Sequence, residues 1–107
     1  GWSFGGAVVI NAGAASETVA AVVTVASQTY GAGAVSNLSP KPLLLIHGTA
    51  DRTLPASCSQ DLYDRAREPK ELVLYERANH GIDQKREQLL DRIEAFFIET
   101  LSEAVTY

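Results

Sequence analysis

The sequence predicts an α/β protein whose open, mostly parallel sheet lies in a three-layer arrangement. Two short runs, residues 19–26 and 42–47, are almost continuously apolar, as in strands that are covered on both faces. Segments with helical periodicity alternate with these runs, and Gly or Pro residues separate them. Such an alternation indicates parallel strands joined by crossover helices, with ligands bound at the carboxyl ends of the strands.

The first expected element is a helix over residues 4–15. It is rich in Ala, Val and Gly and has no polar face, so most of its surface should be buried. Residues 19–26 follow as the first strand. Residues 27–41 contain Gly31, Gly33, Asn37 and Pro40, and this composition predicts a loop.

The second strand is expected over residues 42–47, and Gly48 ends it. Pro55 then opens a helix that Pro69 stops. One face of this helix repeats apolar side chains, namely Leu62, Tyr63 and Ala66.

A third strand is expected over residues 72–75, followed by a long final helix over residues 83–103. The helical spacing of its apolar residues predicts one buried stripe opposite a charged face. The stripe comprises Leu89, Leu90, Ile93, Phe96, Phe97 and Leu101.

Length, composition and charge narrow the function classes. The 107 residues are 46% hydrophobic and 21% charged, which is typical of one globular domain. The net charge of -4, without a cluster of Lys and Arg, argues against nucleic acid or an anionic membrane as a partner. No apolar run reaches the roughly 18 residues of a membrane helix, and a cytoplasmic location is expected.

The segment Gly1-Trp2-Ser3-Phe4-Gly5 fits the pattern G-x-S-x-G, in which a strand turns sharply into a helix and presents a serine at the apex. We expect both flanking glycines to be required, because a Cβ there would collide with the neighbouring strand or helix. The pattern is short, and a small-residue turn before a buried helix would also satisfy it. A phosphate-binding loop is not indicated, since the spacing G-x-G-x-x-G and a following Lys are both missing.

Two further candidate residues each follow an expected strand. Asp51 lies in His47-Gly48-Thr49-Ala50-Asp51, and His80 lies in Asn79-His80-Gly81. The order Ser, Asp, His along the chain is that of one class of catalytic triad. Asp51 could instead be a turn or N-cap residue, and His80 a plain loop histidine. His47 precedes Asp51 and so breaks the order; we expect it to pack or hydrogen-bond beneath the loop.

These motifs resemble the C-terminal half of an α/β-hydrolase-fold protein, with dienelactone-hydrolase-like and serine-esterase-like members the most similar. Residues 42–55 match the acid-bearing strand and loop of that family, P-x-L-x-x-x-G-x-x-D-x-x-x-P, and residues 75–81 resemble its final strand and histidine loop. The resemblance implies one partial α/β-hydrolase domain, residues 1–107, that begins at the nucleophile elbow.

The resemblance also implies roles for individual residues. Ser3 would be the nucleophile, His80 the general base and Asp51 the carboxylate that orients His80. The backbone N–H of Phe4 would be one donor of the oxyanion hole. The side chains of Trp2 and Phe4 either line a substrate pocket or simply cover the elbow. No cofactor or metal is expected, and the substrate would be a small ester-like molecule.

The family's strands before the elbow have no counterpart in this sequence, which also lacks Met. Such a sheet would have an open edge, so we expect either a missing N-terminal half or self-association. Two functions from different classes follow. The chain is either a serine hydrolase of carboxylic esters or related acyl bonds, or a non-catalytic remnant or assembly module that needs a complementary chain.

Overall fold

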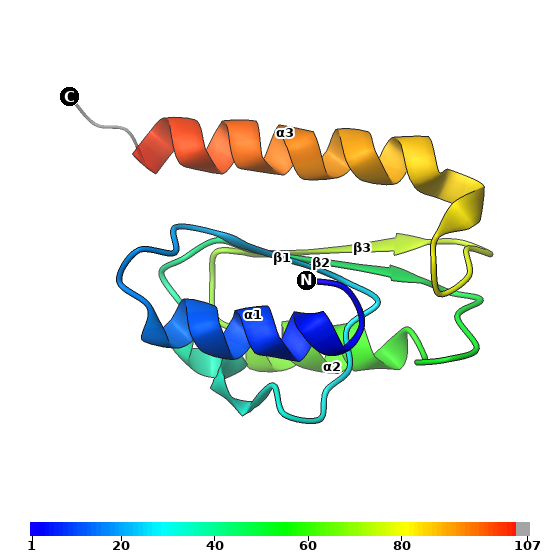
Figure 1. Cartoon of the computed structure of the whole chain (residues 1–107), viewed down its shortest axis with the longest axis horizontal. Helices are drawn as coiled ribbons and strands as arrows, with labels where there is room; N and C mark the ends of the chain where they lie inside the picture. Colours follow the sequence, from blue (N-terminus) through cyan, green and yellow to red (C-terminus); the bar gives the residue numbers. More distant parts are fainter. Residues whose placement is uncertain (105–107) are drawn as a thin grey trace.

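The sheet is three-stranded and entirely parallel, and its order follows the chain. A computed structural model describes residues 1–104. The strands are β1 (Val22–Val25), β2 (Leu43–Gly48) and β3 (Lys70–Tyr75). Helices α1 (Phe4–Ala15) and α2 (Ser57–Arg65) cover one face, and α3 (Arg86–Ala104) covers the other (Figure 1). This arrangement confirms the predicted three-layer α/β fold.

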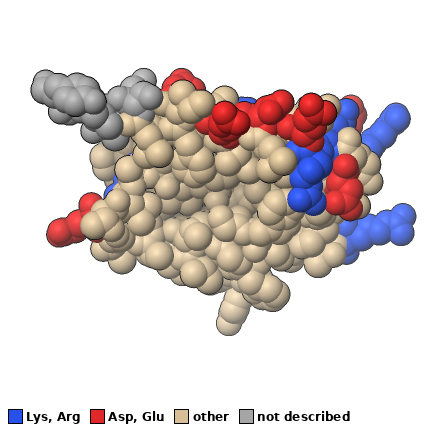
Figure 2. Space-filling model, turned by 45° about the horizontal axis from the view of Figure 1, so that its top comes forward, with Lys and Arg blue, Asp and Glu red and all other residues tan. Residues whose placement is uncertain are grey.

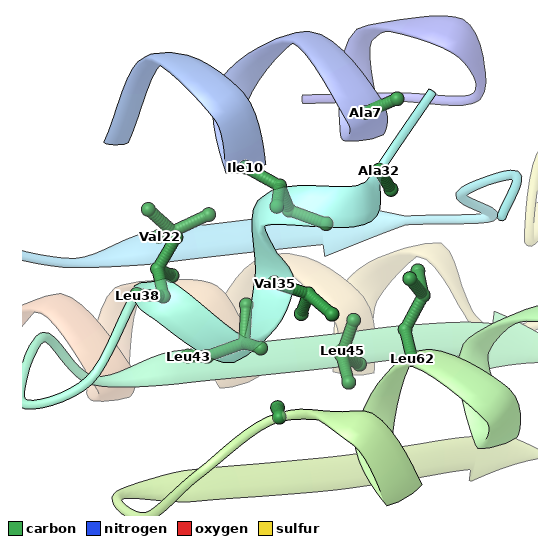
Figure 3. Packing of buried hydrophobic residues seen from close by; sticks show 10 residues of the cluster. Ala7, Ile10, Val22, Ala32, Val35, Leu38, Leu43, Leu45 and Leu62 are labelled. Atoms are coloured by element: carbon green, nitrogen blue, oxygen red, sulfur yellow. The ribbon is translucent and has the colours of Figure 1, made fainter. Parts of the chain in front are cut away.

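Alternate residues of each strand enter two separate hydrophobic clusters, because successive side chains of a strand point to opposite faces. Leu43 and Leu45 pack toward α1 and α2, whereas Leu44 and Ile46 pack toward α3. Figure 3 shows the first cluster, in which side chains of α1, β2 and α2 converge on Val35. All six residues of β2 are buried, as the continuous apolar run predicts.

The first strand and the loop after it differ from the expectation. The strand begins at Val22, three residues later than predicted, and residues 27–41 contain a 3₁₀-helix, η1 (Gly33–Asn37). Val35 and Leu38 are both buried in the cluster beneath α1. Their burial orders a segment that its Gly and Pro content had marked as a loop.

The final helix is also more finely divided than predicted. Residues Asp83–Lys85 form a 3₁₀-helix, η2, and the α-helix begins at Arg86. The predicted stripe was too wide, because Leu90 is 57% exposed and Leu101 is 43% exposed. Leu90 follows the fully buried Leu89 by one residue, and a rotation of about 100° carries it off the sheet-facing side. Within residues 1–104 no helix combines the length and apolarity needed to cross a membrane.

The glycines around the elbow have unequal steric roles. A Cβ on Gly1 would lie 2.2 Å from the carbonyl oxygen of Gly5, as the motif predicts. The same expectation was wrong for Gly5 itself, where an added Cβ meets no atom within 4 Å. The close approach falls instead on Gly6, whose Cβ would lie 2.2 Å from Oγ of the buried Ser27. Gly6 therefore allows α1 to pack against the segment that follows β1.

This difference predicts opposite effects for two neighbouring substitutions. Gly6→Ala should lower the free energy of unfolding by about 1–3 kcal/mol, since the Ser27 backbone must shift to admit the methyl group. Gly5→Ala, its matched control, should leave stability unchanged or raise it by roughly 0.5–1 kcal/mol through helix propensity. Urea unfolding of both variants measures the two effects. Equal losses would show that the packing at Gly6 is not the cause.

Candidate active site

Ser3 stands at a strained turn between the sheet and α1. Its backbone angles are φ 55° and ψ -118°, a combination that costs an L-residue conformational energy. Backbone contacts of Trp2 and Ser3 with β1 hold the turn in place. Trp2 forms a parallel bridge with Val25, and the Ser3 N–H donates to the Val25 carbonyl at 2.9 Å. The geometry is that expected of an elbow that presents a side chain at its apex.

The N-terminus of α1 offers one free backbone donor next to Ser3. The N–H groups of Gly5 and Gly6 donate to the carbonyls of Trp2 and Ser3. The N–H of Phe4, the first helical residue, has no acceptor among residues 1–104. It lies where the partial positive charge of the helix end is greatest. The structure thus leaves the predicted oxyanion donor available.

The aromatic side chains beside Ser3 differ in their surroundings. The Phe4 ring is 72% exposed, whereas Trp2 is 37% exposed and lines an apolar groove along β1. The pocket wall and the cover for the elbow both stay predictions for these two side chains.

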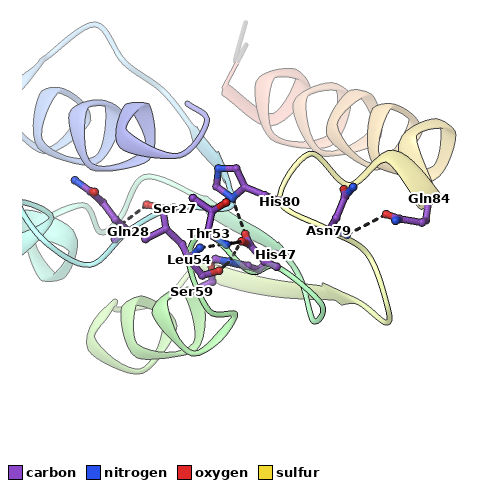
Figure 4. A network of polar contacts seen from close by, with 10 residues as sticks. Ser27, Gln28, His47, Thr53, Leu54, Ser59, Asn79, His80 and Gln84 are labelled. Atoms are coloured by element: carbon purple, nitrogen blue, oxygen red, sulfur yellow. Dashed lines mark hydrogen bonds and ion pairs between the residues drawn. The ribbon is translucent and has the colours of Figure 1, made fainter.

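Asp51 follows β2 and its carboxylate is fully buried. Oδ1 accepts the backbone N–H groups of Thr53 and Leu54, both at 2.8 Å. Oδ2 lies 2.7 Å from Nδ1 of His80 (Figure 4). Asp51 therefore stabilises its own turn and also contacts the candidate base. The two roles predicted for it, a turn residue and the partner of His80, are compatible.

The loops of Asp51 and His80 meet because β2 and β3 are neighbouring parallel strands, whose carboxyl ends lie side by side. The Ala50 N–H donates to the Ala78 carbonyl at 2.9 Å, and the Arg77 N–H donates to Oγ1 of Thr49 at 2.8 Å. A Cβ on Gly48 would lie 2.3 Å from the Ala78 oxygen. Only glycine permits this approach of the two backbones.

His80 is held in its own loop so that one ring nitrogen remains available. Its side chain is 28% exposed, and Nδ1 faces Asp51. Asn79 fixes the loop by pairing with Asp83 in both directions, at 3.0 Å each, and by donating its backbone N–H to Gln84. With Nδ1–H bound to Asp51, Nε2 of a neutral ring is unprotonated and is a base.

Arg86 connects the elbow with the histidine loop, a contact that the sequence analysis missed. Its guanidinium carbon lies 5.2 Å from the centre of the Trp2 ring. The same group donates to the Gly81 carbonyl at 2.8 Å and pairs with Asp83 at 3.1 Å. Arg86 looked like one more residue on the charged face of the last helix, and no local motif distinguishes it.

The candidate residues are assembled to different degrees. Asp51 and His80 are in direct contact, whereas the Ser3 hydroxyl makes no hydrogen bond to any residue in the range 1–104. A hollow of about 370 Å³ lies beside His80, with Arg52, Thr53 and Arg77 among its lining residues. No three His, Cys, Asp or Glu side chains among the described residues are grouped as a metal site.

The environment of Asp51 favours its charged form. Burial alone would raise the pKa of this carboxyl, but the N–H groups of Leu54 and Thr53 and the His80 imidazole outweigh it. The net result is a lowered pKa. An ionised Asp51 suits the task of stabilising an imidazolium at His80.

The comparison with known sequences identifies a family. The sequence profile of the prolyl oligopeptidase family matches residues 21–104, a range that contains Asp51 and His80 but not Ser3. The uncharacterized protein YfhR of Escherichia coli K12 is 42% identical over 66 residues, which cover 55% of this chain and 23% of YfhR. The aligned part therefore spans about a quarter of this relative's length.

Solved structures share the fold at low sequence identity. The α/β hydrolase GrgF from Penicillium superposes with a TM-score of 0.84 at 15% identity, over 95% of this chain and 63% of GrgF. Est1E from Butyrivibrio proteoclasticus superposes with a TM-score of 0.77 at 17% identity, over 95% of this chain and 60% of Est1E. These likenesses confirm the predicted α/β-hydrolase fold.

The lowered pKa of Asp51 predicts an acid-sensitive contribution to stability. An unfolded Asp carboxyl titrates near about pH 3.9. Because the folded pKa is lower, the stabilisation is complete above that pH and is lost as the pH falls through the folded pKa. Asp51→Asn should therefore be less stable by about 1–3 kcal/mol at pH 6, and this gap should narrow below about pH 4.

Urea unfolding between pH 3 and pH 6 measures the gap. Asp61→Asn is a suitable control, because it removes only an exposed pair with Arg65 and should change stability by less than about 1 kcal/mol. The pKa of Asp83 is also lowered, chiefly by the Asn79 side chain. Asp83 is present in every variant, so its contribution cancels from the difference in unfolding free energy. A gap that stays constant down to pH 3 would contradict the assignment to Asp51.

Proposed function

The chain belongs to the prolyl oligopeptidase family, and from this premise we propose that it carries the reactive side chains of a serine hydrolase acting on a carboxylic ester or a related acyl bond. The observation that carries the proposal is the contact of 2.7 Å between Oδ2 of the buried Asp51 and Nδ1 of His80. Ser3 at its strained elbow is the proposed nucleophile.

The proposed reaction gives each of these groups one role. His80 Nε2 takes the proton from the Ser3 hydroxyl while Oγ attacks the acyl carbon. Asp51 stabilises the imidazolium that forms, and the Phe4 N–H donates to the oxyanion. The proton then passes from His80 to the leaving alcohol or amine. In the second half of the reaction, water gives a proton to His80 and attacks the acyl carbon. His80 then returns the proton to Ser3 Oγ as the carboxylic acid leaves.

The size of the substrate is constrained by the connection between β1 and β2. The segment 27–41 contains only the short helix η1, so a large lid does not enter there. A site without a lid at this point suits small, soluble esters or lactones. The solved structures that share the fold include an esterase domain from Rhodothermus marinus, in line with an ester substrate, and the family name adds amide bonds as a second acyl substrate.

The proposal predicts a single covalent adduct. A fluorophosphonate should add to Ser3 Oγ with loss of fluoride, and intact mass spectrometry should detect one addition per chain. Ser3→Ala should give none. His80→Ala should react at least about a hundredfold more slowly, because the general base is lost.

Ser16→Ala is the matched control for this labelling. Ser16 is half-buried just after α1 and its hydroxyl contacts only Thr18 and nearby backbone, so the variant should react like the unaltered chain. An adduct that survives Ser3→Ala would identify a different nucleophile. A folded chain that forms no adduct at all would favour the second function below.

We infer, second, that this chain requires one more strand along β1. A groove of about 490 Å³ runs beside that edge of the sheet. Apolar residues from three elements line it, among them Val9 and Gly13 of α1, Val23 of β1, and Ile93 and Phe97 of α3. Figure 2 shows a hollow without charged side chains in the middle of one face, with Asp and Glu side chains along its upper border.

The backbone beside the groove already begins a parallel ladder. The nitrogen of Gly1 donates to the Val23 carbonyl at 2.8 Å, and the Val25 N–H donates to the Gly1 carbonyl at 2.9 Å. In a parallel strand, alternate residues pair to opposite sides. Val22 and Ala26 pair toward β2, so the N–H of Val23 points into the groove.

The occupant that fits is a strand leading directly into Gly1. Only a segment joined there continues the existing ladder in the same direction, whereas a strand of a second copy would have to stop where Gly1 begins. The solved relatives support this choice, because the chain covers 63% of GrgF and 60% of Est1E. Without the strand, the elbow is attached to β1 only by the backbone contacts of Gly1, Trp2 and Ser3.

A designed extension tests this inference. Five Val and Ile residues placed before Gly1 should raise the free energy of unfolding by at least about 1 kcal/mol, through new ladder bonds and buried side chains. Counted back from Gly1, Pro at the second added residue should cancel part of this gain in stability, because its missing N–H faces β1. Pro at the first added residue, directly before Gly1, should keep the gain, since that nitrogen faces away from β1.

Urea unfolding and sedimentation of the four chains give the result. The unextended chain should associate or bind a hydrophobic dye, and the extension should abolish both. A dimer that persists after extension would assign the groove to a second copy. An unextended compact monomer that gains nothing from extension would contradict the inference.

A further inference from the structure

His47 is a buried imidazole whose partners are more specific than packing requires. It belongs to β2, its side chain is fully buried, and it lies at the centre of the network in Figure 4. Nε2 lies 2.9 Å from the Leu54 carbonyl oxygen and 3.1 Å from Oδ2 of Asp51. Nδ1 lies 2.7 Å from Oγ of Ser59, which is also buried. Every polar atom of the ring thus has a partner.

These partners determine which nitrogen of His47 carries the proton. A carbonyl oxygen only accepts, so Nε2 must carry a hydrogen to pair with Leu54. Oδ2 of Asp51 lies 3.1 Å from the same nitrogen as a close contact beside the hydrogen bond to Leu54. In a neutral ring Nδ1 is then an acceptor, and the Ser59 hydroxyl donates to it. The hydroxyl thereby favours the form in which Nε2–H faces the Leu54 carbonyl.

These contacts reach the Asp51 carboxylate in two ways. Oδ1 accepts the N–H groups of Thr53 and Leu54, and Oδ2 faces His80 Nδ1 at 2.7 Å. His47 Nε2 holds the carbonyl of Leu54, whose N–H donates to Oδ1, and the same nitrogen lies 3.1 Å from Oδ2. Loss of Nε2 would release the Leu54 peptide and open the space beside Oδ2, so the carboxylate could turn away from His80.

We propose that His47 is a positioning residue for the candidate triad: through the Leu54 peptide and its close contact with Oδ2, it keeps the Asp51 carboxylate in the orientation that fixes His80 as its Nδ1–H tautomer. This tautomer leaves Nε2 of His80 unprotonated and able to accept a proton from Ser3. The inference rests on the proposed function, in which His80 is the base. The other charged side chains at the His80 loop are Arg52 and Arg77, which line the hollow beside the ring, and Asp83 and Arg86, which pair with each other. None of these four is paired with Asp51 in the structure.

Two substitutions separate the contacts of Nε2 from the contact of Nδ1 with Ser59. The amide nitrogen of Gln in His47→Gln reaches approximately the place of Nε2 and keeps a donor toward Leu54, close to Asp51. The shorter amide in His47→Asn reaches only the place of Nδ1, so it keeps Ser59 and loses both Leu54 and Asp51. The two variants have similar polarity, and urea unfolding of both records how far each is destabilised.

Nitrogen NMR of the imidazole rings gives the readout, since the full sequence contains only two histidines and each variant leaves His80 alone. In the unaltered chain His47 should be the Nε2–H form and His80 the Nδ1–H form, with a slowly exchanging Nδ1 proton. His47→Gln should preserve the His80 form. His47→Asn should shift His80 toward a mixture of tautomers and lose the slowly exchanging signal.

Three results would overturn the proposal. One is an unaltered chain in which His47 carries its proton on Nδ1, a measurement that needs no variant and holds even if His47→Asn fails to fold. Another is a folded His47→Asn variant with the His80 tautomer unchanged. The third is an equal change in both variants, which would indicate a merely structural role. The measurement needs no hydrolysis, so it is independent of whether Ser3 reacts with a fluorophosphonate.

Discussion

The buried charge of Asp51 is the constraint on which the arrangement of the strand ends depends. A carboxylate without solvent needs a full set of donors, and a missing one costs several kcal/mol. Here the donors come from its own turn and from the loop after β3 through His80, and His47 of β2 packs 3.1 Å from Oδ2. The two loops must therefore approach closely, and Gly48 allows their backbones to touch. Burial of one charge thus fixes the relative positions of three segments.

Parallel pairing explains why such distant residues lie together. All three strands end at the same edge, so the segments after β2 and β3 are neighbours although Asp51 and His80 are 29 residues apart. Ser3 reaches the same edge from the other side of the sheet, through its bond to Val25 at the end of β1. Arg86 then spans the remaining space between Trp2 and Gly81. The candidate site is a product of strand direction more than of any local motif.

Much of the fold and of the candidate site could be predicted, because local motifs and repeated apolar patterns in the sequence indicate them. The helix over residues 4–15 agrees with α1 at both ends, since the elbow pattern begins it and a run of small apolar residues continues it. The meeting of Asp51 and His80 followed from chain order and strand direction. What failed depends on contacts distant in sequence. The burial of Val35, the exposure of Leu90, the open space at Gly5 and the bridging role of Arg86 are all decided by neighbours that no local pattern reveals.

Trp2 belongs to two parts of the molecule at once. It lines the apolar groove beside β1, and it immediately precedes the strained residue Ser3. Any coupling between the filling of the groove and the geometry of the elbow therefore passes through Trp2, and such coupling is reciprocal. If a strand in the groove favours the strained turn, a group attached at Ser3 that requires that turn strengthens the docking of the strand by the same factor.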